Sequence, residues 1–234
     1  MTNHQIVSQT EWLAARKELL VKEKEFTRLR DQLSQQRRDL PWERVEKEYV
    51  FDGPNGKETL ADLFDGKSQL VIYHFMFGPD WDEGCPSCSF WADNYGGIPM
   101  HLAHRDVAHV TISRAPLAKL EDWKQRMGWD FKWVSSHDSD FNFDYHVSFA
   151  PQQFENGGAM YNYRSIQEGE ESPGISVFYK DDDGAIYHTY STYARGLDML
   201  NLAYHYLDLV PKGRDEESLP WTMAWLRYRD SYED

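Results

Sequence analysis

The chain has 234 residues, of which 41% are apolar and 15% aromatic, and this length supports one enlarged globular domain with a hydrophobic core. Its 39 Asp and Glu residues outnumber its 25 Lys and Arg residues. The resulting net charge of -14 repels phosphate backbones and anionic lipid, so we expect neither nucleic-acid nor membrane partners. The N-terminal residues lack the basic and apolar regions of a secretory signal, and two cysteines cannot build a disulfide framework, so we expect a cytoplasmic protein.

Residues 1–40 are predicted to form an N-terminal helical arm. Ser8 and Glu11 have the spacing of a capping box at a helix start. Apolar residues then recur every seven positions, at Trp12, Leu19, Phe26, Leu33 and Leu40. The companion positions three residues further on carry Ala, Lys, Leu and Gln, so the apolar stripe is narrow. Two interpretations stay open: the arm joins two copies of the chain into a homodimer, or it packs along its own domain.

Residues 41–210 are predicted to form an α/β domain, and residues 211–234 a polar C-terminal extension. A strand and turn lead into the mostly apolar run at 68–77 and then the run at 106–113, which are typical of central buried strands. A helix follows, from Pro116 to about Met127, and Gly128 is its stop signal.

The second half of this domain begins with a short strand, "FKWVSS", and then an aromatic stretch at 141–172 without a clear period, which we interpret as an insertion or loop. Two further strand segments flank the turn "DDDG" and predict a hairpin, and an amphipathic helix at 197–209 closes the domain.

Both cysteines lie in "GCPSCSFW", between the first buried strand and the helix after it. Thiols at positions i and i+3 of a helix start lie on one face, close enough to form a disulfide. The unpaired N–H groups there favour a thiolate, so Cys85 is predicted to attack a substrate disulfide and Cys88 to resolve the mixed disulfide. Pro86 suits the first turn of the helix and is also a candidate for substrate binding. Acidic residues just upstream, Asp80 to Glu83, oppose thiolate formation.

A zinc site is an alternative interpretation of the same cysteines. The pattern Cys85-x2-Cys88-x12-His101-x2-His104 resembles Cys2His2 spacing, with a final gap one residue shorter than usual. Against this alternative, the cysteines follow a buried strand and enter a helix, whereas zinc knuckles place them on loops or hairpins. A third interpretation is that the two thiols are buried and inert.

The stretches "HFMFGPDW", "CPSCSFW" and "HTYSTYARG" resemble the domain of unknown function 899 family, and the resemblance covers nearly the whole chain. Members of that family are thioredoxin-like and are described at most as predicted dithiol-disulfide oxidoreductases. The resemblance therefore implies a thioredoxin-like α/β fold, a central mixed sheet flanked by helices, which the order of elements also indicates. Such domains carry a cis-proline just before a central strand and against the redox pair, and Pro173 occupies the matching position. An ordinary turn proline at a strand start is the alternative interpretation of Pro173.

The segment "LADLFDGKSQLVIYHF" is similar to the same region of peroxiredoxins, which makes a thiol-dependent peroxidase the first alternative function. Peroxiredoxins place Thr or Ser three residues before the reactive cysteine, whereas this chain has Asp82 there. The second alternative is a non-enzymatic binding protein of the same fold whose cysteines hold zinc or sense redox state.

Several other residues are candidates for substrate binding. Trp81 and Trp91 bracket the cysteines and either shield a disulfide or belong to the core. His188 and Tyr190 are predicted to share one face of a strand, and Arg195 is a candidate for binding a carboxylate or another anion. His74 lies inside a buried strand and is interpreted as a core residue.

The sequence as a whole predicts a thiol–disulfide oxidoreductase whose redox-active disulfide takes the place of an organic cofactor. The substrate class is a protein or small-molecule thiol or disulfide.

Overall fold

The computed structural model describes residues 4–232, so the two ends of the predicted arm and extension, 1–3 and 233–234, lie outside the described residues. It divides into two units between Pro41 and Trp42. The first unit contains α1 (Gln9–Arg38), which confirms the predicted helix. Its start is fixed by a reciprocal cap: the Glu11 N–H donates to Ser8 Oγ at 3.3 Å, and the Ser8 N–H donates to the Glu11 carboxylate at 2.9 Å. No residue of α1 is buried.

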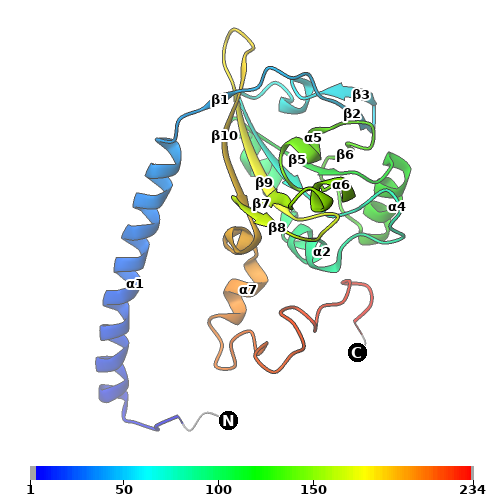
Figure 1. The fold of residues 1–234 in the computed structure, drawn as a ribbon. Helices are drawn as coiled ribbons and strands as arrows, with labels where there is room; N and C mark the ends of the chain where they lie inside the picture. The colour runs from blue at the N-terminus through cyan, green and yellow to red at the C-terminus, as the bar shows by residue number, and fades with distance from the viewer. Residues whose placement is uncertain (1–3, 233–234) are drawn as a thin grey trace. The chain divides into compact units, whose positions relative to one another are not determined.

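The second unit, from Trp42 on, contains a mixed eight-stranded sheet in the order β1-β10-β9-β4-β5-β6-β2-β3 (Figure 1). Its strands are β1 (Glu43–Arg44), β2 (Val50–Gly53), β3 (Gly56–Thr59), β4 (Gln69–His74), β5 (Val107–Ser113), β6 (Trp133–Ser135), β9 (Gly174–Lys180) and β10 (Ile186–Tyr193). The α-helices are α2 (Pro86–Ala92), α3 (Ile98–Ala103), α4 (Leu117–Met127), α5 (Phe141–Asp144), α6 (Pro151–Glu155) and α7 (Leu202–Leu207). Three 3-10 segments complete it: η1 (Asp62–Phe64), η2 (Asp93–Tyr95) and η3 (Ala194–Leu200).

Strand order and direction establish the thioredoxin-like fold. β4 and β5 are parallel neighbours joined by a crossover that contains α2, and β9 pairs antiparallel with the other edge of β4. β10 then pairs antiparallel with β9, and α7 follows it. The order β10-β9-β4-β5 is that of a thioredoxin domain, as predicted. Along the chain, helices follow β4, β5 and β10, which also matches that fold.

β4 alternates its side chains between two cores, one on each face of the sheet. Tyr73 belongs to the core that also contains residues of α2, α4 and α7. Ile72 belongs to the opposite core, which contains residues of η1 and α5. Because β4 is covered on both faces, its sequence is almost continuously apolar. The cysteines lie on the Tyr73 face.

Two sequence predictions need correction. Residues 141–172 are more than a loop, since they contain α5, α6 and a hairpin of β7 (Ala159–Tyr161) and β8 (Arg164–Ile166). Its turn is formed by Asn162 and Tyr163, both at positive φ, where a turn usually carries glycine. The predicted helix at 197–209 is interrupted at Asn201, whose extended backbone separates η3 from α7 and whose side chain caps α7 by accepting the Tyr204 N–H at 3.0 Å.

The other predicted elements are confirmed. α4 ends at Gly128, which has the left-handed φ of 62° that favours glycine at this position. Strands β9 and β10 form the predicted hairpin. Within residues 4–232, no helix has the combination of length and apolar character needed to cross a membrane.

Candidate active site

The segment after β4 returns to the end of that strand and places Cys85 at the N-cap of α2. The Cys85 N–H donates to the carbonyl of Met76 at 3.0 Å, which fixes the backbone at this position. Pro86 occupies the first turn, as predicted, and Ser89 Oγ donates to the Cys85 carbonyl at 3.0 Å. The sequence therefore forms a rigid strand–loop–helix connection with one thiol at its tip.

Cys85 is partly exposed, and the pKa of its thiol is lowered to about 7. The largest cause of the lowered pKa is a hydrogen bond with the Cys88 thiol, and hydrogen bonds with the N–H groups of Cys88 and Ser87 lower the pKa further. Burial acts in the opposite direction and raises the pKa. Of the upstream carboxylates, Glu83 is engaged by Arg126 at 2.8 Å. A group with a pKa near 7 is substantially ionised at neutral pH, as a nucleophilic thiol requires.

Cys88 is buried one helical turn further on, and its environment is the opposite of that of Cys85. Its Sγ accepts the Met76 N–H at 3.4 Å, and burial raises the pKa of the thiol, although a hydrogen bond from the Tyr73 hydroxyl opposes this. Both cysteines are free thiols in the structure. The two environments therefore distinguish a partly exposed, acidic thiol from a buried, protonated one.

A cavity of about 300 Å³ lies beside Cys88. One wall comes from the Cys88 side and includes Trp91. Pro173 and Arg195 also line the cavity, and so does Met223 from the C-terminal segment. Most of the lining side chains are apolar, and the charged lining residues are Arg195 and Asp198. The cavity can therefore hold a small, largely apolar group next to the buried thiol.

Pro173 lies where the sequence predicts, directly before β9 and in the wall of this cavity. Of the two interpretations of Pro173, the structure agrees with the ordinary proline at a strand start, because every peptide bond among residues 4–232 is trans. The segment is held at two points: the Ser172 N–H donates to the Val147 carbonyl at 2.7 Å, and the Tyr161 hydroxyl donates to the Pro173 carbonyl at 2.9 Å.

The two predicted tryptophans have different surroundings. Trp91 is buried and donates from Nε1 to the Leu197 carbonyl at 2.9 Å, so it is both a core residue and part of the cavity wall. Trp81 is partly buried on the loop before Cys85 and donates to Glu170 at 2.8 Å. Lys119 holds this loop by donating to the carbonyl of Trp81 at 3.0 Å.

Tyr190 and His188 do not share a face, contrary to the prediction. A bulge in β10 lets them pair with adjacent residues of β9, Val177 and Phe178, so the usual alternation is lost. Tyr190 is not among the described residues that line the cavity beside Cys88. Arg195 does line it, and its guanidinium pairs with Asp198 at 2.8 Å.

The proposed zinc ligands are not assembled. Among residues 4–232, no three His, Cys, Asp or Glu side chains lie close enough together to hold a metal ion. The four-ligand set of Cys85, Cys88, His101 and His104 therefore does not exist in this structure, because α2, η2 and α3 carry the chain away from the cysteines before His101 is reached.

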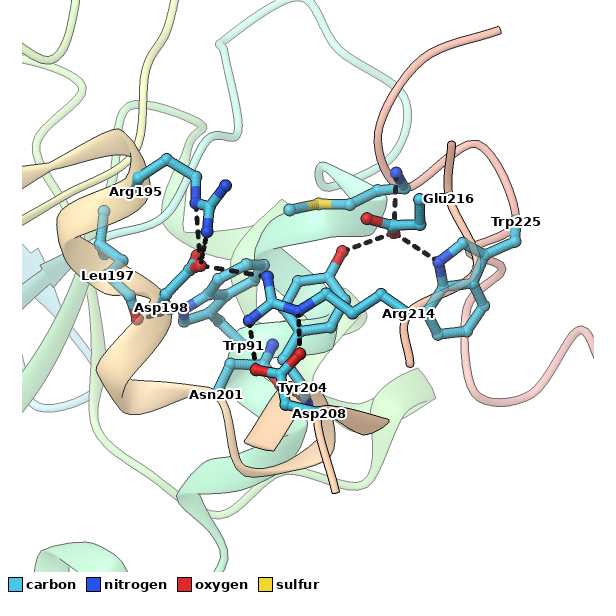
Figure 2. A network of polar contacts seen from close by, with 11 residues as sticks. Trp91, Arg195, Leu197, Asp198, Asn201, Tyr204, Asp208, Arg214, Glu216 and Trp225 are labelled. Atoms are coloured by element: carbon cyan, nitrogen blue, oxygen red, sulfur yellow. Dashed lines mark hydrogen bonds and ion pairs between the residues drawn. The ribbon is translucent and has the colours of Figure 1, made fainter. Parts of the chain in front are cut away.

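Sequence reasoning missed the contribution of the C-terminal segment to the site. Arg214 bridges Asp198, at 3.1 Å, and Asp208, at 2.8 Å (Figure 2). One oxygen of Glu216 accepts from the Tyr204 hydroxyl at 2.8 Å and from Trp225 Nε1 at 2.7 Å. The same oxygen accepts the Met223 N–H at 3.0 Å. These contacts hold Met223 in the wall of the cavity, and the only signal for them in the sequence is the aromatic residues of an otherwise polar tail.

The family profile of DUF899, described as a bacterial protein of unknown function, matches residues 1–232. The chain belongs to the DUF899 family. A comparison of this DUF899 chain with curated proteins finds no match.

Three solved structures are similar to the DUF899 chain at low identity. Peroxidoxin BcpB from Mycobacterium tuberculosis is 13% identical, with a TM-score of 0.46, over 70% of this chain and 94% of its own. Peroxiredoxin Q from Xanthomonas campestris is 13% identical, with a TM-score of 0.47, over 70% and 96%. The mitochondrial 2-Cys peroxiredoxin from Plasmodium falciparum is 14% identical, with a TM-score of 0.39, over 71% and 92%. The fold assignment rests on the strand order described above.

The core interpretation of His74 is confirmed in the DUF899 chain. The imidazole is buried, stacks on Phe141 with ring centroids 5.7 Å apart, and its Nε2 lies 2.9 Å from Ser176 Oγ. Burial lowers its pKa to about 3, so it is neutral. It lies on the face of the sheet opposite the cysteines, since it neighbours Tyr73 along β4.

Proposed function

We propose that the protein is a thiol–disulfide oxidoreductase in which Cys85 attacks and Cys88 resolves. The observation that carries the proposal is the contrast between the two thiols: Cys85 is partly exposed with a pKa lowered to about 7, and Cys88 is buried with a raised pKa. A low-pKa thiol attacks a disulfide efficiently at neutral pH, and a protonated partner does not compete with it for substrate.

The reaction proceeds in two exchanges. The Cys85 thiolate attacks one sulfur of the substrate disulfide, the substrate S–S bond breaks, and the other substrate sulfur leaves as a thiolate that takes up a proton. The Cys88 thiol then loses its proton and attacks Cys85 Sγ, which releases the second substrate thiolate. The substrate is reduced by two electrons and the cysteine pair is oxidised to a disulfide, which a cellular thiol reductant must reduce again before the next cycle.

The surroundings of the pair fit these steps. The Met76 N–H that contacts Cys88 Sγ, at 3.4 Å, donates to it and stabilises negative charge when Cys88 deprotonates in the second exchange. The cavity beside Cys88, with Trp91, Pro173 and Arg195 in its walls, is the place where we expect the substrate to bind. Arg195 would attract a carboxylate of the substrate. The proposal also requires a reducing compartment to regenerate the thiols, which fits the cytoplasm.

The test uses the full-length protein and oxidised glutathione as the probe. We expect the wild-type protein to lose both thiols together, reversibly, and to form an intramolecular disulfide detectable by mass. The Cys88→Ser variant should accumulate one glutathione on Cys85, because the resolving thiol is missing. Cys85→Ser is the matched control and should react much more slowly, since its remaining thiol is buried.

Three outcomes would overturn the proposal. One is the independent loss of the two thiols without a disulfide between them. Another is equal glutathionylation of the two variants, which would show that burial does not distinguish the thiols. The third is stoichiometric zinc that protects both thiols in protein purified without chelator, which would support a metal-binding or sensing role. Consumption of hydrogen peroxide with a thiol reductant, faster than glutathione reduction, would assign the peroxidase reaction to the same pair.

A further inference from the structure

Taken by itself, the first unit leaves the apolar side chains of α1 uncovered, among the residues that the structure describes. No residue of this thirty-residue helix is buried, and Phe26 and Trp12 are 67% and 58% exposed. Helices of soluble proteins gain most of their stability by packing an apolar face. The exposed Phe26 and Trp12 therefore mark α1 as an interaction surface.

Four apolar residues of α1 recur at one heptad position and form a narrow seam, while Leu13, Leu20 and Val21 lie outside it. If Trp12, Leu19 and Phe26 are assigned to heptad position a, together with Leu33, then position d carries Ala15, Lys22, Leu29 and Gln36. A helix that packs on a globular core has a wider stripe, with a third apolar position in each heptad. Polar residues at d lower the stability of a coiled coil and help to fix its register.

The charges that flank the seam distinguish between the two orientations of a pair. Position g carries Glu11, Glu18 and Glu25, with the neutral Gln32 as the exception. Position e carries Arg16, Arg30 and Arg37, with Glu23 as the exception. In a parallel pair, each g residue faces the e residue five positions later in the other helix. Glu25 then faces Arg30 of the second copy, and Glu11 faces Arg16. The exception is Glu18, which faces Glu23. The repulsion between these two carboxylates is weakened because Arg16 pairs with Glu23 within the helix at 2.8 Å.

An antiparallel pair of the same helices is disfavoured. Antiparallel packing brings g residues opposite g residues and e residues opposite e residues. With Phe26 at the centre, Glu25 would face Glu25 of the second copy, Glu11 would face Asp39, and Arg16 would face Arg37. Only Glu23 and Arg30 would attract each other, so repulsion dominates.

We propose that α1 joins two copies of the chain as a parallel, in-register, two-stranded coiled coil, with Trp12, Leu19, Phe26 and Leu33 at its a positions. This inference is independent of the redox chemistry proposed for the cysteines. A second copy of α1 can cover the seam, because identical helices present the same apolar stripe to each other, with oppositely charged g and e residues on either side of it. The polar d positions indicate a dimer that dissociates on dilution.

The first test is the molar mass of the full-length protein, measured by sedimentation across a dilution series. We expect a dimer, and Phe26→Glu should raise the dissociation constant at least about tenfold, because it places two like charges in the seam. Lys24→Glu is the matched control: it introduces the same residue on the outer face, at position f, and should leave the dissociation constant within about twofold. Thiol counts should be unchanged in both variants, and helix content from circular dichroism should be unchanged in Lys24→Glu.

The second test fixes the orientation. Glu25→Arg should weaken the dimer in the parallel arrangement, since the introduced guanidinium would then face Arg30 of the second copy, and adding Arg30→Glu should restore it. The antiparallel arrangement gives no rescue. Leu33→Cys in a Cys85→Ser/Cys88→Ser background should cross-link on oxidation, because a positions of a parallel pair lie opposite each other. In the antiparallel pair the two cysteines would be roughly 20 Å apart along the axis.

A monomer at every concentration, or a dimer that Phe26→Glu leaves intact, would overturn the proposal. So would a dimer that dissociates with Phe26→Glu but lacks both the charge rescue and the Leu33→Cys cross-link, since the pair would then be antiparallel.

Discussion

The hydroxyl of Tyr228 donates a hydrogen bond of 2.8 Å to the carbonyl oxygen of Gly84, the residue directly before the candidate nucleophile. The Tyr228 ring also packs edge-on against Trp123 of α4, with centroids 5.0 Å apart. The C-terminal segment is thereby fastened to both ends of the candidate site, through Met223 at the cavity and Tyr228 at the loop before Cys85. The polar tail is a structural part of the site.

We expect Tyr228→Phe to make Cys85 more reactive without unfolding the protein. The substitution removes one hydrogen bond, a loss of about 1 kcal/mol, and keeps the ring packed on Trp123. The loop at Gly84 should open more often, so the alkylation rate of Cys85 by iodoacetamide should rise severalfold at constant pH. Tyr232→Phe, which alters another hydroxyl of the tail, is the control. An unchanged alkylation rate in Tyr228→Phe would show that the C-terminal tail does not control access to the Cys85 thiol.

The alkylation rate of Cys85 should follow a titration with a midpoint near pH 7. Cys88→Ala should move this midpoint upward, because the Cys88 thiol is the largest cause that lowers the pKa of Cys85. Cys88→Ser should move it less, since a hydroxyl still donates a hydrogen bond. Iodoacetamide modification at each pH, read by mass, measures all three. A midpoint near the ordinary thiol value in the wild type would contradict the assignment of Cys85 as the nucleophile.

Glu216→Ala should loosen the C-terminal segment while the sheet stays folded. One carboxylate oxygen accepts three hydrogen bonds, from Tyr204, Trp225 and Met223, and removing it leaves these donors unpaired. We expect rapid proteolytic cleavage after residue 210 and a destabilisation of about 1–3 kcal/mol. Glu217→Ala, at the adjacent exposed carboxylate, is the matched control and should be neutral. Equal resistance of the two variants to proteolysis would disprove the role of the Glu216 carboxylate.

We expect the ionisation of Glu171 to lower the free energy of unfolding as the pH rises from about 4.5 to about 7. Its buried side chain accepts from Ser148 Oγ at 2.6 Å and pairs with Arg114 at 2.8 Å, yet burial raises its pKa from 4.5 to about 7. Between these values the folded state binds more protons than the unfolded state, so deprotonation costs folding free energy.

The measurement is the free energy of unfolding of the wild type minus that of Glu171→Gln, from denaturant titrations between pH 4.5 and 8. We expect this difference to decrease by on the order of 1–3 kcal/mol through the window and to level off above it. Glu168→Gln, at a nearby exposed carboxylate, should give a flat difference. Parallel pH profiles for the wild type and Glu171→Gln would contradict the raised pKa.

The fold was predictable wherever a local signal agreed with the tertiary environment. The apolar run around β4 is buried on both faces, and Gly128 ends α4 with the positive φ that glycine adopts easily. The prediction failed where a non-glycine residue takes on such a conformation, as Asn162 and Tyr163 do in the β7–β8 turn. Asn201 also interrupts a continuous apolar pattern, which periodicity alone cannot detect.

The candidate site was predictable at the cysteine pair and at the place of Pro173, because both depend on strand–helix order. The sequence did not reveal the bulge in β10, which separates His188 from Tyr190, since no glycine marks it. The sequence also did not reveal the hydrogen bonds through which Glu216 fixes the C-terminal tail, because hydrogen bonds of polar side chains leave no periodic pattern in a sequence. Long-range contacts of this kind are visible only in three dimensions.

The bond from Tyr228 to Gly84 joins residues 144 positions apart, and it has a consequence for biosynthesis. A ribosome that adds 5–20 residues per second needs roughly 7–29 s to travel from the loop before Cys85 to its fastening point. Until Tyr228 is made, the loop before Cys85 lacks this contact, and until Lys180 is made β4 also lacks its partner β9. The contact that fastens the loop before Cys85 is therefore among the last to form during synthesis, and Cys85 is more accessible to oxidants on the nascent chain than in the finished fold.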